Sequence, residues 1–138
     1  MWFGTNNSIL KFVDQIAEVE QYELAFSMYS FCSEYYFTEQ NDRAYCKARM
    51  GDLAAPCPYL MGSHHDSGID YFREAISIDI DCGDAWLGAL VTYGIQPPAH
   101  TDAMLAASAA DRIQQYLTHT PHGYRERAER ALKNYLNC

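Results

Sequence analysis

The 138-residue chain has the composition of a folded globular protein, with 49% hydrophobic and 20% charged residues and only eight glycines and five prolines. Its formal net charge of −8 argues against DNA or RNA as a partner, because phosphate binding requires a basic surface. The length is that of one domain, and we expect residues 1–138 to form a single helical domain.

The sequence shows no signal for export or membrane insertion. The N-terminal residues lack the basic start and apolar stretch of a secretory signal, and the charged residues Lys11 and Asp14 interrupt the apolar positions after residue 8. The most apolar windows, 53–62 and 85–95, are too short to cross a bilayer. The five cysteines are an odd number without paired spacing, which favours reduced thiols. We therefore predict a cytoplasmic protein that does not bind membranes.

The first third of the chain carries two helical patterns. Residues 6–8, Asn-Asn-Ser, offer an N-cap for a helix whose apolar positions Ile9, Val13 and Ile16 are three and four residues apart. A second apolar stripe, in a different phase, comprises Leu24, Met28, Phe31, Cys32 and Tyr35. Either one long helix is kinked near residue 20, or two helices meet there.

The middle of the chain is less regular. A short helix is expected around Ala44 and Ala48, ending at Gly51. Residues 51–67 contain two prolines and lose the helical pattern, so we expect a loop or a broken helix. A loop of this length in a small domain is unusual and often functional.

The second half returns to helical periodicity. Ser67 or Asp66 can cap a helix over residues 69–79, and a helix that starts at Asp84 is expected to end at Gly94. After a break at 96–98, Thr101 or Asp102 can cap a helix that extends to residue 117, and Pro121 opens the last helix in its favoured first-turn position.

No region shows the sustained alternation that is typical of strands. The predicted fold class is therefore all-α. We expect about six helices in antiparallel hairpins, arranged either as a regular array or as an irregular helical bundle.

Residues 68–94 carry large and small side chains at intervals suited to packing neighbouring helices. Phe72 is followed three residues later by Ala75, and Trp86 precedes Tyr93 by seven residues. This stretch resembles the junction between two tetratricopeptide repeats, in which the second helix of one repeat meets the first helix of the next. The resemblance implies a TPR-like array of helical hairpins that binds proteins, and it implies no catalytic residues.

The group with the most chemical potential is His64, His65 and Asp66, which comes after Cys57 in the proline-containing loop. Imidazole and thiolate are good zinc ligands. The sequence lacks any Cys-x-x-Cys or His-Glu-x-x-His motif, so we predict no metal, no cofactor and no catalytic residue. A metal-binding protein or small enzyme centred on Cys57, His64 and His65 remains the alternative.

Asp79, Asp81 and Asp84 alternate in a way that invites comparison with a calcium loop. They lack the glycine placement and the closing glutamate of that loop. We predict an inter-helix turn with capping carboxylates instead.

The N-terminal region is both aromatic and acidic. Too many aromatic residues lie off a single stripe for all of them to be buried, and exposed tyrosine is a common anchor at protein interfaces. Residues 1–40 also carry six acids against Lys11 alone, so a partner with a basic surface is expected. The predicted partner-binding residues are Tyr29, Tyr36, Tyr59, His64, His65 and Asp66.

These features together favour a protein–protein interaction module without enzymatic activity. Such a module could be an adaptor, or an inhibitor of the immunity-protein type that neutralises a basic target. A structural homo-oligomer is a further alternative, in which the spare aromatic residues and the basic last helix meet a second copy.

Overall fold

The computed structural model describes residues 1–62, 67–95 and 102–137. These ranges are all-helical, which confirms the predicted fold class. The α-helices in them are α1 (Ser8–Glu18), α2 (Tyr22–Phe31), α3 (Gln40–Asp52), α4 (Ile69–Ile78), α5 (Gly83–Ile95), α6 (Ala103–Tyr116) and α7 (His122–Leu136). A π-helical turn, η1 (Cys32–Tyr36), extends α2, and the short 3₁₀ turns η2 (Pro58–Met61) and η4 (Leu117–His119) come after α3 and α6.

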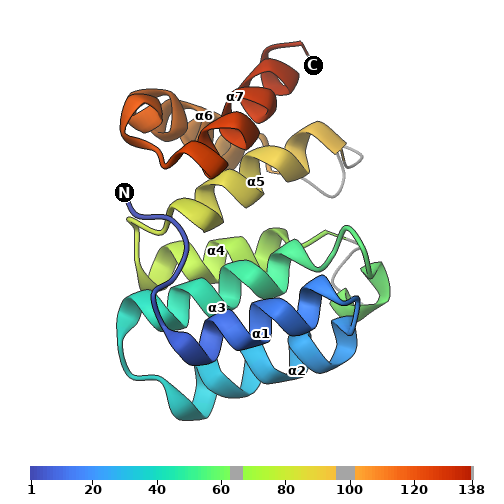
Figure 1. Ribbon diagram of the computed structural model, residues 1–138. Helices are drawn as coiled ribbons and strands as arrows, with labels where there is room; N and C mark the ends of the chain where they lie inside the picture. The colour runs from blue at the N-terminus through green and yellow to red at the C-terminus, as the bar shows by residue number, and fades with distance from the viewer. Residues whose placement is uncertain (63–66, 96–101, 138) are drawn as a thin grey trace.

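Each helix packs on the next one along the chain, and α5 also contacts α3 and α7. In Figure 1, α5 lies between the α3–α4 pair and the α6–α7 pair. The α1–α2 hairpin therefore lies at one end of the molecule and α7 at the other. Within the described ranges, no helix combines the length and apolarity needed to span a bilayer.

The core has two parts. The larger part surrounds α5 and contains Phe72, Ala75 and Trp86, all buried, while Tyr93 is half-buried with its ring 5.5 Å from that of Tyr135. The smaller part holds α1 and α2 against α3. Four buried cysteines, Cys32, Cys46, Cys57 and Cys82, are free thiols.

Several predicted boundaries are confirmed. The Asn7 side chain caps α1 by accepting from the amides of Ile9 and Leu10, and the Asp102 side chain caps α6 in the same way. Of the two arrangements expected near residue 20, separate helices are correct. Glu20 turns the chain between them with a left-handed φ of 65°, a conformation that is uncommon for a side-chain-bearing residue.

Three other boundaries are wrong. Gly51 lies inside α3 instead of ending it, α5 continues one residue beyond Gly94, and Gly68 occupies the N-cap of α4 without a side-chain capping bond. Asp66, the other predicted cap, lies outside the described residues. The two glycines explain part of the error: a Cβ on Gly68 would be 2.2 Å from the Gly51 carbonyl oxygen, so both are needed for helix packing.

The chain ahead of α1 reaches the turn between α4 and α5. Residues 2–3 run beside the turn between α4 and α5, where Trp2 and Cys82 form a parallel bridge, and the chain bends at Gly4. In Figure 1 this dark-blue segment descends from that turn to the start of α1.

The turn between α4 and α5 has a capping carboxylate, as predicted. Asp79 accepts from the Asp81 amide at 3.0 Å.

We predict that Gly68→Ala lowers the free energy of unfolding by about 1–3 kcal/mol, because the new methyl group forces α3 and α4 apart. Chemical denaturation followed by circular dichroism measures this change. Gly123→Ala in α7 is the matched control, since a Cβ there meets no atom within 4 Å. It should leave stability unchanged or raise it by up to about 1 kcal/mol. Equal effects of both substitutions would contradict the close packing of α3 on α4.

Candidate interaction surface

One side of α2 exposes large apolar side chains. Leu24 and Phe31 are seven residues apart, which places them on the same helix face. Phe31 contacts Tyr35 of η1 with ring centroids 5.5 Å apart, and Tyr35 is 80% exposed. We call Leu24, Phe31, Tyr35 and Tyr36, together with Glu23 and Tyr59, the α2 surface.

The opposite side of α2 is fixed by a half-buried carboxylate, that of Asp14 in α1. Tyr29 is fully buried, and its hydroxyl donates to Asp14 of α1. Tyr45 of α3 donates to the other oxygen of the same carboxylate at 2.6 Å. Arg49 Nε lies 3.4 Å from Asp14 Oδ1. Burial raises the pKa of both tyrosine hydroxyls even further above neutral pH, and both act as donors. Tyr29 therefore points inward and forces Leu24 and Phe31 outward.

The N-terminal end of α2 carries an acidic pocket. A pocket of about 500 Å³ is lined by residues 20–24 with Cys57 and Tyr59. The Tyr59 hydroxyl donates to the Glu23 carboxylate, and this bond raises the pKa of Tyr59. Two glutamates, Glu20 and Glu23, thus line a pocket of a size that admits a lysine or arginine side chain.

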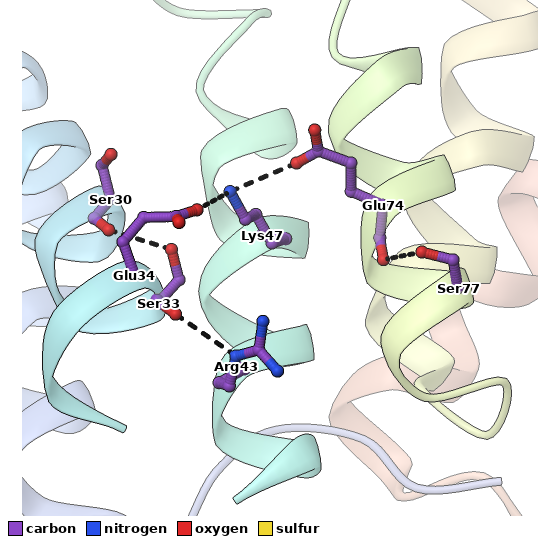
Figure 2. A network of polar contacts seen from close by, with 7 residues as sticks. All are labelled: Ser30, Ser33, Glu34, Arg43, Lys47, Glu74 and Ser77. Carbon is purple, nitrogen blue, oxygen red and sulfur yellow. Dashed lines mark hydrogen bonds and ion pairs between the residues drawn. The ribbon is translucent and has the colours of Figure 1, made fainter. Parts of the chain in front are cut away.

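The other end of the α2 surface is supported by an ion-pair network that Figure 2 shows. Lys47 Nζ on α3 lies 2.8 Å from Glu34 Oε1 and 3.2 Å from Glu74 Oε2. Burial opposes the charge of Lys47, but the bond to Glu34 and the charge of Glu74 raise its pKa overall. The same bond lowers the pKa of Glu34. Because one cation is shared by two carboxylates, the network adds no positive charge to this end.

Arg43 holds the π-helical turn in place from the neighbouring helix. Its Nε donates to the Ser33 carbonyl at 3.3 Å, as Figure 2 also shows. A π-turn leaves its carbonyls displaced from regular helical partners, and such turns are frequent at functional sites. This contact positions Tyr35 and Tyr36 beyond the end of α2.

The charges around the α2 surface have one dominant sign. Lys11 is the single base within residues 8–36, whereas Glu18, Glu20, Glu23 and Glu34 are all exposed acids. Like charges gathered on one side of a small domain produce a negative potential that attracts basic surfaces.

The structure separates the predicted partner-binding residues. Tyr36 and Tyr59 are 57% and 64% exposed, but they lie at opposite ends of α2. Tyr29 is a core residue, so its assignment to a partner surface is wrong. His64, His65 and Asp66 lie outside the described residues.

Sequence reasoning missed Leu24, Phe31 and Tyr35 as surface residues because they fit a helical stripe. In the structure the buried stripe is instead Ala25, Tyr29 and Cys32. Both stripes have three- and four-residue spacing, so periodicity alone could not choose between them. The one available signal was Ala25, since a small residue favours close contact between helices.

Comparisons of the chain with known protein families, curated proteins and solved structures found no match. In the part of the chain that the structure describes, no three His, Cys, Asp or Glu side chains are grouped so as to hold a metal ion. The assignment of a function thus depends on the α2 surface itself.

We predict that Tyr29→Ala costs about 3–5 kcal/mol of unfolding free energy, because it opens a cavity and removes a donor to Asp14. Phe31→Ala, two residues away on the exposed side, should change stability by less than about 0.5 kcal/mol. Denaturant titration of the two variants in parallel distinguishes them. A large loss for Phe31→Ala would mean that the α2 surface belongs to the core.

Proposed function

We propose that this protein is a protein–protein interaction module that binds a basic partner protein through the α2 surface. The observation that carries the proposal is an exposed apolar and aromatic helix face bordered by carboxylates. Contiguous exposed apolar side chains with a polar border are characteristic of interaction sites on soluble domains.

The two ends of the surface suggest separate roles in binding. Phe31 and Tyr35 would supply the apolar contact, since rigid aromatic side chains bury much area at a low cost in conformational entropy. The pocket with Glu20 and Glu23 would receive a lysine or arginine of the partner. Tyr59 supports this role by holding the Glu23 carboxylate in one position.

The stacking of the helices supports a binding role by its likeness to a helical-repeat array. The pairs α3–α4 and α5–α6 pack in sequence, while α3 contacts α5 and α5 contacts α7. Arrays of helical hairpins commonly act as adaptors or inhibitors that offer a surface to another protein. The buried free thiols favour the cytoplasm as the compartment in which this occurs.

The proposal predicts one stoichiometric complex with a basic protein, strongest at low salt because the charge attraction is screened as salt rises. The partner is captured from native lysate, identified by mass spectrometry, and titrated in purified form. Phe31→Ala and Tyr35→Ala should each weaken the dissociation constant about tenfold or more. Glu23→Gln should slow association and reduce the salt dependence.

Met104→Ala serves as the control for these variants. Met104 is 82% exposed on α6, away from the α2 surface, so its truncation should leave affinity unchanged. Binding that is lost equally with Met104→Ala, or that survives all three changes on the α2 surface, would place the interface elsewhere.

A further inference from the structure

The first residues of the chain occupy a cradle that is built by the turn between α4 and α5. The Trp2 amide donates to the Asp81 carbonyl at 2.9 Å, and the Gly83 amide donates to the Trp2 carbonyl at 2.7 Å. Both main-chain polar groups of Trp2 are thus paired, as in the addition of an extended strand to an edge. Main-chain bonds of this kind depend on an extended segment and not on its covalent connection to the cradle.

Side chains make the contact selective. The Trp2 indole Nε1 donates to Asp79 Oδ2 at 3.0 Å, and the Phe3 ring packs 4.9 Å from the Tyr124 ring of α7. The Gly4 amide donates to Asp84 Oδ2 at 2.7 Å. Asp84 is only 5% exposed, and its burial raises its pKa although the Gly4 amide and Tyr124 hydroxyl both bond to it.

Glycines on both sides make the fit possible. A Cβ on Gly83 would lie 2.5 Å from the Trp2 carbonyl oxygen and 2.7 Å from the Phe3 ring. Gly4 has a φ of +72°, a conformation that favours glycine. The cradle of Asp79, Asp81, Gly83, Asp84 and Tyr124 is therefore shaped for a Trp-Phe-Gly segment that bends at its glycine.

The segment makes these contacts without being fully buried. Residues 1–5 are half-buried, and residues 5–7 connect them to α1. A cleft of about 550 Å³ lies alongside, between the segment, α3 and α7. A segment with few fully buried groups opens at a lower cost than the whole fold.

We propose that residues 1–4 exchange between two copies of this chain, each copy placing its segment in the cradle of the other. The second copy is the occupant that the structure specifies, because it carries the same Trp-Phe-Gly segment that fits the cradle here. Exchange reproduces every contact of the segment, so its opening is compensated by the same bonds in the dimer. This inference does not depend on the α2 surface.

Closure within one chain competes with exchange. A short tether gives an effective concentration on the order of millimolar, so the wild-type protein should be mainly monomeric at micromolar concentration. Exchange is therefore best tested with two variants that cannot close on themselves.

The first variant, Gly83→Ala, blocks the cradle but keeps the segment. The second, Trp2→Ala with Phe3→Ala, weakens the segment but keeps the cradle. Each alone should sediment as a monomer, whereas an equimolar mixture at about 0.1 mM should show twice the monomer mass. The control mixture replaces Gly83→Ala by Gly123→Ala, whose segment remains in its own cradle, and its dissociation constant should be at least tenfold higher.

Circular dichroism establishes that the variants are folded, and Trp2→Ala alone replaces the double variant if that one unfolds. A mixture that remains monomeric up to about 1 mM, with both variants folded, would overturn the proposal. So would an equal affinity in the control mixture, since association would then not depend on a free segment.

Discussion

The Asp14 carboxylate determines how the first two helices sit on the rest of the molecule. It accepts from Tyr29 of α2 and Tyr45 of α3 and lies beside Arg49, so one half-buried group joins three helices. The Tyr29 side chain is fully buried, and its hydroxyl would be costly to leave without a partner, so its bond to Asp14 favours one rotational setting of α2. That setting turns the other face of α2 toward solvent and produces the candidate interaction surface.

The two ends of the molecule differ in the side chains that they expose. α7 exposes mostly polar side chains, among them Glu126, Glu129, Arg130 and Lys133, which suits the outer helix of a helical array. The α1–α2 end instead exposes large apolar groups, including Phe12, Phe31 and Tyr35. Its bordering acids keep that face hydrated and give it a negative potential. The asymmetry supports one end as a solvent cap and the other as a docking face.

The sequence allowed prediction of the features that depend on local signals. The helical class, the caps at Asn7 and Asp102 and the core positions Phe72 and Trp86 follow from spacing and residue type. The rotation of α2 could not be predicted, because two stripes of equal periodicity overlap and the choice depends on Asp14, a residue in another helix. The packing roles of Gly51 and Gly68 could not be predicted for the same reason. Each glycine is required by a contact with a residue that is distant in the sequence, Gly51 in α3 with Gly68 at the start of α4.

The most direct test of the α2 surface is site-specific photocrosslinking in the bound complex. A photoreactive phenylalanine analogue replaces Tyr35 in one preparation and Met104 in another, both highly exposed positions. The account predicts a covalent adduct with the partner from position 35 and none from position 104. An adduct from position 104 alone would contradict it, because the partner would then lie on α6 and the exposed face of α2 would have no part in binding.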